Sequence, residues 1–168
     1  MEGQLKKICS GGQTGVDRAA LDVALYLQMP HGGWCPRGRR SEDGPISKQY
    51  LLRETESADY SVRTEKNIID TDGTLILHHG PLSGGTKLTW KLAKRHQSPV
   101  LKIDLESQNI AISAPAFWDW VEQQQIATLN VAGPRESSCA GIGELSRRFL
   151  LALFDCDGGR DANANPLP

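Results

Sequence analysis

Strand and helix patterns alternate along this chain, and glycine clusters mark three junctions where a strand passes into a helix. Residues 5–10 form an apolar strand pattern that stops at Gly11 and Gly12. The apolar positions after it are spaced by 4, 3 and 4 residues, which indicates one face of a helix. Strands that alternate with helices in this way predict a mostly parallel sheet with right-handed crossovers and helices on both faces.

Further elements of both kinds follow the first strand and helix. The pattern predicts strands near residues 33–35, 73–78, 99–103 and 127–131, and helices over 60–70, from Leu88, from Pro115 and over 142–153. Proline suits the first position of a helix, where its missing N–H would have no intrahelical acceptor. We therefore expect an α/β fold with a mostly parallel sheet of five or more strands.

Two segments fall outside this regular pattern. Residues 36–58 are too rich in turn-forming and charged residues for regular structure. Connections of that length are uncommon in compact domains unless they are functional or disordered, so this one is a candidate binding loop. Residues 157–168 are polar and rich in helix breakers, which predicts a flexible tail. We expect residues 1–156 to form a single ligand-binding domain.

The charge balance and the length of the apolar runs argue against two classes of partner. The formal net charge is −1, whereas nucleic-acid-binding domains are usually strongly basic. No apolar run approaches the roughly 20 residues that cross a bilayer. The first residues also lack the apolar segment of a secretory signal. We therefore expect a cytoplasmic protein that binds neither nucleic acid nor membrane.

The spacing of cysteine and histidine predicts no metal site. The four cysteines lie far apart, form no C-x-x-C pair and are expected to be reduced thiols: Cys9, Cys35, Cys139 and Cys156. His78 and His79 are adjacent, so they point to opposite faces if the strand continues through them. No H-E-x-x-H or H-x-x-E-H spacing occurs.

Three glycine loops are expected to meet at one edge of the sheet. They cover residues 10–18, 80–87 and 133–138, each directly after a predicted strand. Parallel sheets bind ligands beyond the carboxyl ends of their strands. Glycine lets a ligand approach the backbone amides, and a helix N-terminus favours an anion. One such loop is explained by a tight turn with a Ser or Thr cap, but three at one edge indicate a phosphate site.

The candidate ligand-binding residues lie in these loops, in the arginine-rich segment after residue 35, or on the helix before the third strand. They are Gly11, Gly12, Gln13, Thr14, Gly15, Asp17, Arg18, Arg37, Arg39, Asn67, Ser83, Gly84, Gly85, Thr86, Lys87, Gly133, Pro134, Arg135, Glu136 and Ser137. Guanidinium groups can hold a phosphate with two parallel hydrogen bonds. The segment 37–40, which includes Arg40, is expected to cover part of the site. Neither G-x-G-x-x-G nor G-x-x-x-x-G-K-[ST] is present, which disfavours an ordinary dinucleotide or P-loop site.

Several of these residues have a second explanation that the sequence leaves open. Asp17 is equally a first-turn acid favoured by the helix dipole. Asn67 is equally a local cap, since its amide both donates and accepts hydrogen bonds. Trp34 either stacks on a heterocyclic ligand or belongs to the core. Cys35, beside the arginine-rich segment, is expected to be a small buried residue.

Several linked motifs resemble the molybdenum cofactor carrier family. They are SGGQTGVDRAALD at 10–22, GWCPRGRR at 33–40, EDGP at 42–45, LRET at 52–55, RTEKN at 63–67, GPLSGGT at 80–86 and NVAGPRES at 130–137. The resemblance covers roughly residues 5–154. The family belongs to a wider Rossmann-like group that contains the Lonely-guy and lysine-decarboxylase-like proteins.

This resemblance implies a Rossmann-like three-layer sandwich and a homo-oligomer, either a dimer or a tetramer. It also implies binding of the molybdenum cofactor, a phosphorylated pyranopterin, for storage, protection or delivery to molybdoenzymes. The pterin ring has an amidine-like donor edge that can donate hydrogen bonds to a carboxylate. The phosphate of the cofactor can accept hydrogen bonds from amides and arginines. Carboxylates near the loops are Asp17, Glu42, Asp43 and Glu136.

One position departs from the pattern of the nucleotide-cleaving members of that group. They resemble one another in a P-G-G-x-G-T-x-x-E stretch whose glutamate serves catalysis, and Thr89 stands at that position here. A threonine hydroxyl cannot act as a carboxylate base near neutral pH. We therefore assign no catalytic residue and expect a binding protein. The first alternative is a nucleotide sensor or phosphoribohydrolase-like enzyme that uses the same loops. The second is a scaffold whose glycine loops serve only as turns and bind no phosphorylated ligand.

Overall fold

The computed structural model describes residues 5–107 and 109–155. Five parallel strands form one sheet in the order β2-β1-β7-β5-β6. These strands are β1 (Lys7–Cys9), β2 (His31–Gly32), β5 (Gly73–His78), β6 (Val100–Asp104) and β7 (Thr128–Ala132). Two further strands, β3 (Trp34–Cys35) and β4 (Arg53–Glu54), pair with each other in a small separate sheet. The parallel sheet expected from the sequence is confirmed.

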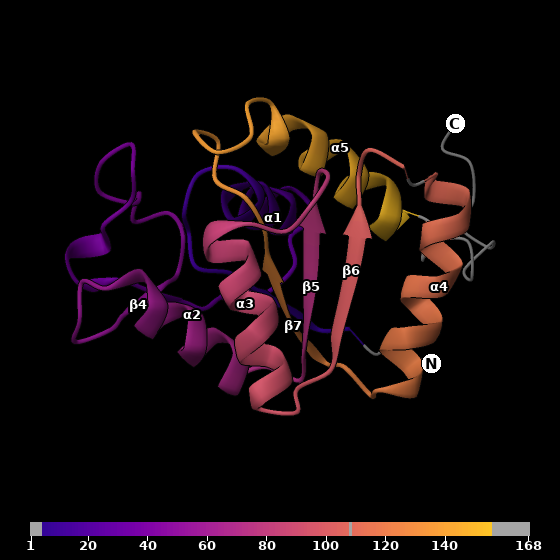
Figure 1. Cartoon of the computed structure of the whole chain (residues 1–168), viewed down its shortest axis with the longest axis horizontal. Helices are drawn as coiled ribbons and strands as arrows, with labels where there is room; N and C mark the ends of the chain where they lie inside the picture. The colour runs from indigo at the N-terminus through magenta and orange to yellow at the C-terminus, as the bar shows by residue number, and fades with distance from the viewer. Residues whose placement is uncertain (1–4, 108, 156–168) are drawn as a thin grey trace, which may run out of the picture.

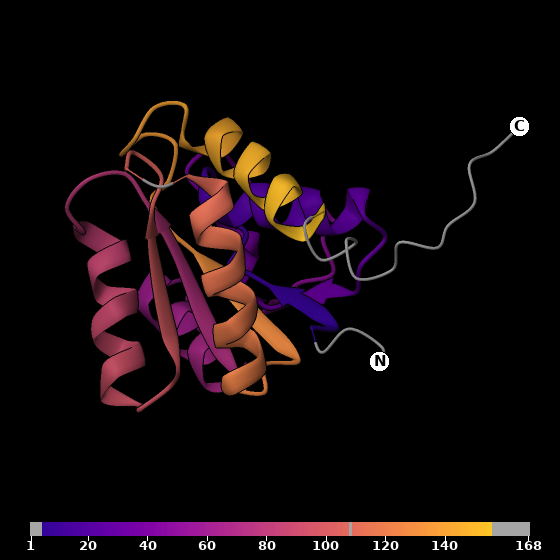
Figure 2. The same ribbon diagram turned by 90° about the vertical axis from the view of Figure 1, so that its right-hand side faces the viewer.

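Helices cover both faces of the five-stranded sheet (Figures 1 and 2). One layer contains α1 (Val16–Tyr26), α4 (Ile110–Gln123) and α5 (Ile142–Asp155), where α5 contacts both of the others. The opposite layer contains α2 (Tyr60–Ile69) and α3 (Gly84–Arg95), which contact each other. The result is the Rossmann-like three-layer sandwich expected from the sequence.

The larger apolar core lies between the sheet and the layer of α1, α4 and α5. Ile8, Leu75, Leu77 and Leu129 of the strands are fully buried there, together with Phe117 of α4. Burying a side chain of this size stabilises the fold by about 1.5–3 kcal/mol. A smaller core on the other face joins α2 to α3 through Ile68, Leu92 and Ala93. These two cores hold the strand ends in fixed positions.

Two elements differ from the sequence expectation. The helix predicted from Pro115 begins at Ile110, because the Asn109 side chain accepts a hydrogen bond from Ala111 N and starts the helix earlier. Pro115 therefore lies inside α4, where it forgoes one backbone hydrogen bond. The strand predicted near 33–35 is divided, since His31–Gly32 joins the main sheet and Trp34–Cys35 pairs with β4.

Residues 36–58 contain little regular structure, as expected, apart from the short helix η1 (Arg37–Arg39) and β4. The predicted tail 157–168 and Cys156 lie outside the described residues. Cys9 and Cys35 are buried free thiols, and Cys139 is a partly buried one. Within the described part of the chain, no helix is both long enough and apolar enough to cross a membrane.

Candidate functional site

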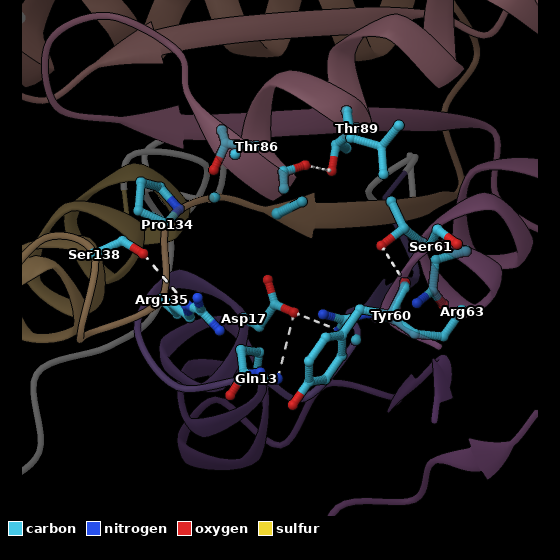
Figure 3. A pocket seen from close by; sticks show the side chains of 18 of the residues that line it. Gln13, Asp17, Tyr60, Ser61, Arg63, Thr86, Thr89, Pro134, Arg135 and Ser138 are labelled. Carbon is cyan, nitrogen blue, oxygen red and sulfur yellow. Dashed lines mark hydrogen bonds and ion pairs between the residues drawn. The ribbon is translucent and has the colours of Figure 1, made fainter. Parts of the chain in front are cut away.

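A cavity of about 250 Å³ lies beyond the carboxyl ends of β1, β7 and β5, which are neighbours at the centre of the sheet (Figure 3). The three glycine loops follow these three strands, so the sheet order brings them together. Helix α2 contributes the fourth side of the cavity. The lining residues are Gly11, Gln13, Asp17, Tyr60, Ser61, Arg63, Thr64, Asn67, Ser83, Gly84, Gly85, Thr86, Leu88, Thr89, Asn130, Ala132, Gly133, Pro134, Arg135 and Ser138.

The first glycine loop is packed directly against the third. Gly15 has φ +78°, and a Cβ atom there would lie 2.3 Å from the carbonyl oxygen of Pro134. That carbonyl accepts a hydrogen bond from Val16 N at 3.2 Å, which occupies the N-terminus of α1. The contact requires glycine, since any side chain would force the two loops apart.

Three amides of the first loop are used inside the protein. Thr14 N donates to Gln13 Oε1 at 3.0 Å, and Gln13 N donates to Asp17 Oδ2 at 3.4 Å. Gly12 N donates to Ser10 Oγ at 3.4 Å. This loop therefore shapes the wall of the cavity, and the amides of Gly12, Gln13 and Thr14 are not available to an anion.

The N-terminus of α3 remains available to a ligand. Its N-cap residue, Ser83, makes no side-chain cap, and no acidic residue occupies the first turn. The amides of Gly84, Gly85 and Thr86 have no acceptor within the helix, because the first turn of an α-helix leaves its N–H groups unpaired. Ser83 and these three residues all line the cavity. The helix dipole and the open amides favour a negatively charged group at this end.

Two cationic side chains line the cavity: Arg63 and Arg135. Arg135 is exposed at the rim, where its Nε donates to Ser138 Oγ at 3.3 Å and lies 3.5 Å from Glu42 Oε2. Arg63 is buried to 9% exposure in the wall formed by α2. Asp17 is the one carboxylate among the described lining residues.

Most of the predicted cations point elsewhere. The Arg39 guanidinium donates to the carbonyls of residues 46, 47, 50 and 52 and so holds the loop 36–58 together. Arg18 donates to the Gly12 carbonyl and to Asp43. Arg37 and Lys87 are exposed, outside the lining. The Arg40 guanidinium packs over the ring of Tyr60 at 4.8 Å and donates to the Ala58 carbonyl.

Several other predicted residues face a second, more open groove on the far side of the first loop. Predicted residues on its lining are Thr14, Gly15, Arg18, Glu136 and Ser137. Glu42 joins the loops here, because it accepts hydrogen bonds from the hydroxyls of Thr14 and Ser137 and from Ser137 N. These bonds lower the pKa of Glu42. Glu136 accepts from the amides of Gly141 and Gly143 at the start of α5.

Asn67 and Trp34 form one structural unit. Trp34 N donates to Asn67 Oδ1 at 2.8 Å, and Asn67 Nδ2 donates to the Trp34 carbonyl at 2.9 Å. The Trp34 ring lies 4.3 Å from the Arg53 guanidinium and 4.2 Å from Lys66 Nζ, and its Nε1 donates to Asp70. The amide of Asn67 is therefore used by the backbone of β3, although the residue lines the cavity. The aromatic ring on the lining is Tyr60.

Several lining residues are absent from the ligand-binding set that the sequence predicts. They are Tyr60, Ser61, Arg63, Thr64, Leu88, Thr89, Asn130, Ala132 and Ser138. Three of those on α2 could have been found from helical spacing, since Tyr60, Arg63 and Thr64 lie on one helix face with the predicted Asn67, seven positions after Tyr60. Thr89 is buried, and its hydroxyl donates to the Gly85 carbonyl at 2.9 Å.

Asp17 and Arg63 form a buried ion pair in the cavity wall. Arg63 Nη1 lies 2.9 Å from Asp17 Oδ2, and Asp17 is 6% exposed. Burial raises the pKa of Asp17, and the neighbouring Arg63 guanidinium opposes that rise. Within residues 5–107 and 109–155, no group of three or more His, Cys, Asp or Glu side chains could hold a metal ion. The site offers amides, hydroxyls, two guanidinium groups and one carboxylate.

The fold and this cavity define a Rossmann-like α/β protein with a polar pocket beyond the carboxyl ends of its three central strands. The chain belongs to the circularly permutated YpsA SLOG family, and the match spans residues 8–154. It is also similar to the crystal structure of a protein from Syntrophus aciditrophicus SB named "Putative molybdenum carrier protein". The two share 44% identity with a TM-score of 0.87, over 90% of this chain and 96% of that chain. No curated protein matches the chain.

Proposed function

We propose that the protein binds the molybdenum cofactor, a phosphorylated pyranopterin, in the cavity at the carboxyl ends of β1, β7 and β5. The observation that carries the proposal is the open N-terminus of α3, placed in the same cavity as Arg135. The similarity to a structure named as a molybdenum carrier supports the choice of cargo. The role that follows is storage, protection or delivery of the cofactor.

The phosphate of this ligand binds at the N-terminus of α3. The unpaired amides of Gly84, Gly85 and Thr86 donate to it, and Arg135 at the rim adds a charge-assisted hydrogen bond. Of the other two predicted anion loops, the loop 10–18 shapes the cavity wall and the loop 133–138 contributes Arg135. The pterin ring then extends inward towards α2, beside the ring of Tyr60, over which the guanidinium groups of Arg40 and Arg63 lie at 4.8 and 5.6 Å.

An equilibrium titration with purified molybdenum cofactor tests the proposal. Saturable binding is expected, and Arg135→Ala weakens it by about 10- to 100-fold, because a hydrogen bond to a charged group contributes about 1.5–3 kcal/mol. Arg148→Ala is the matched control, since Arg148 is exposed, pairs with Glu144 at 2.8 Å and does not line the cavity. Failure to bind the cofactor, or equal affinity for Arg135→Ala and the wild type, contradicts the proposal.

The cellular compartment, the oligomeric state and the partner enzymes are proposed from the family resemblance. The protein acts in the cytoplasm as a homo-oligomer and transfers its cargo to molybdoenzymes. Size-exclusion chromatography with light scattering measures the oligomer, and reconstitution of a cofactor-free molybdoenzyme with loaded protein measures transfer. A monomer that does not reactivate the enzyme contradicts this part alone.

A nucleotide ligand is the second candidate function, favoured by the same α3 terminus, since a nucleoside monophosphate also carries a phosphate. A sensor would bind AMP or ADP-ribose without chemistry, whereas a phosphoribohydrolase-like enzyme would release the base. Thr89 stands where the nucleotide-cleaving relatives carry glutamate, and its hydroxyl is bound to the Gly85 carbonyl. Asp17 is then the one carboxylate on the described lining that could assist cleavage. Base release from a nucleoside monophosphate panel, abolished in Asp17→Asn, favours this candidate over carriage.

A further inference from the structure

The buried ion pair in the cavity wall uses only part of its hydrogen-bonding capacity. Arg63 Nη1 bonds to Asp17 Oδ2, whereas Arg63 Nε is buried without a partner. Among the residues that the structure describes, Asp17 Oδ1 and Arg63 Nη2 have no hydrogen bond. Figure 3 shows this second oxygen of Asp17 pointing into the cavity. The ion pair therefore keeps one acceptor, Asp17 Oδ1, and one donor, Arg63 Nη2, that no protein group uses among the described residues.

The backbone leaves room for this pair. A Cβ atom on Gly11 would lie 1.5 Å from Arg63 Nη1 and 2.9 Å from Asp17 Oδ2, so any side chain there would displace the guanidinium. Buried ion pairs add little net stability, and apolar pairs of similar volume often replace them without loss. Stability alone therefore does not account for a buried pair that constrains Gly11 and leaves its own polar atoms without partners.

The negative charge of Asp17 decides which part of a ligand can bind beside the ion pair. A phosphate placed here would face the Asp17 carboxylate, which repels it, whereas the N-terminus of α3 has no carboxylate in its first turn. The inner end of the cavity thus favours a neutral group that presents a donor next to an acceptor. A lactam edge, an N–H beside a C=O, has this pattern.

We propose that Asp17 and Arg63 together recognise a lactam edge on the heterocycle of the ligand. The lactam N–H donates to Asp17 Oδ1, and the lactam C=O accepts from Arg63 Nη2. This inference rests on the proposed function for the position of the phosphate, and it adds the orientation and chemical class of the heterocycle. Pterins and guanine both carry such an edge, so the two sources are separated by experiment.

The ligand arm of the test blocks the lactam N–H by methylation. The dissociation constants of 6-hydroxymethylpterin monophosphate and its 3-methyl derivative are measured by calorimetry with the wild-type protein. The parent is expected to bind roughly 10- to 100-fold more tightly, because the methyl group removes a charge-assisted hydrogen bond and leaves Asp17 Oδ1 without a donor. GMP and 1-methyl-GMP form the second ligand pair, with the same edge on a purine.

The protein arm removes the two charges together. Asp17→Leu/Arg63→Met keeps the volume of the pair, and the ratio between parent and methylated ligand is expected to fall to about one. Asp17→Asn is the second variant, because it keeps the shape of the side chain without its charge. Glu144→Leu/Arg148→Met is the matched control, since it removes an exposed ion pair outside the cavity and leaves the ratio unchanged.

The outcomes separate this inference from the proposed function. A ratio that persists in Asp17→Leu/Arg63→Met is steric in origin, and it overturns the inference even if the molybdenum cofactor binds. Equal affinities in the wild type overturn it as well. A charge-dependent ratio in the guanine pair alone supports the lactam edge and contradicts the pterin cargo. Absence of binding by the pterin, GMP and the molybdenum cofactor overturns both proposals.

Discussion

Gly84 and Gly85 at the start of α3 provide a direct test of the geometry of the proposed anion site. Both have open space where a Cβ atom would lie, with no heavy atom within 4 Å. They differ in backbone conformation, since Gly84 has φ +48° whereas Gly85 does not have a positive φ. Substituting each by alanine therefore adds the same methyl group to neighbouring positions and isolates the effect of φ.

The two substitutions are expected to change stability in opposite directions. Gly85→Ala stabilises the fold by about 0.4–1 kcal/mol, because alanine lowers the entropy of the unfolded chain at a compatible position. Gly84→Ala destabilises it by about 1–2 kcal/mol, because the left-handed conformation brings Cβ close to the following carbonyl oxygen. For a domain of this size these values correspond to a Tm about 1–4 °C higher for Gly85→Ala and about 2–8 °C lower for Gly84→Ala.

Thermal unfolding followed by calorimetry measures both shifts, and ligand titration adds a second readout. Gly85 lines the cavity at the proposed phosphate site, so the added methyl group of Gly85→Ala should weaken binding of the molybdenum cofactor although this variant is more stable. A lower Tm for Gly85→Ala, or an unchanged Tm for Gly84→Ala, would refute the description of this turn. Higher stability with unchanged affinity would refute the phosphate position alone.

Three further predictions concern contacts around the cavity. Gly15→Ala should lower the Tm more than Gly84→Ala does, because it combines φ +78° with a 2.3 Å clash against the Pro134 carbonyl; an equal shift would argue against the close loop packing. The ionised Glu42 stabilises the fold above its ordinary pKa, and this contribution is lost as the pH falls through its lowered folded-state pKa. The free energy of unfolding, measured with denaturant, should therefore fall less steeply in acid for Glu42→Gln than for the wild type. Parallel pH profiles of the two proteins would contradict this. Arg63→Ala should cost about 3–5 kcal/mol, since it leaves Asp17 charged and buried, whereas Asp17→Leu/Arg63→Met should be nearly neutral; equal losses in urea unfolding would contradict the ion-pair argument.

The sequence located the loops of the site more accurately than the side chains that point into it. Gly85, Thr86 and Gly133, which follow predicted strands, line the cavity. Arg39 lies near the predicted site in sequence, yet its guanidinium is held by four carbonyl groups of its own loop. A one-dimensional pattern indicates where a long side chain starts, and the surrounding packing decides where its charged end goes.

The sequence by itself determined the architecture and the family of this protein. Alternating apolar patterns and glycine at strand ends are local properties, and they sufficed to predict a parallel sheet covered by helices and three loops at one edge. The tertiary structure decided that β7 inserts between β1 and β5, which makes those loops neighbours. It also brought Arg63 from α2 to Asp17 on α1, 46 positions apart. Such contacts depend on helix packing between distant segments, which no local pattern specifies.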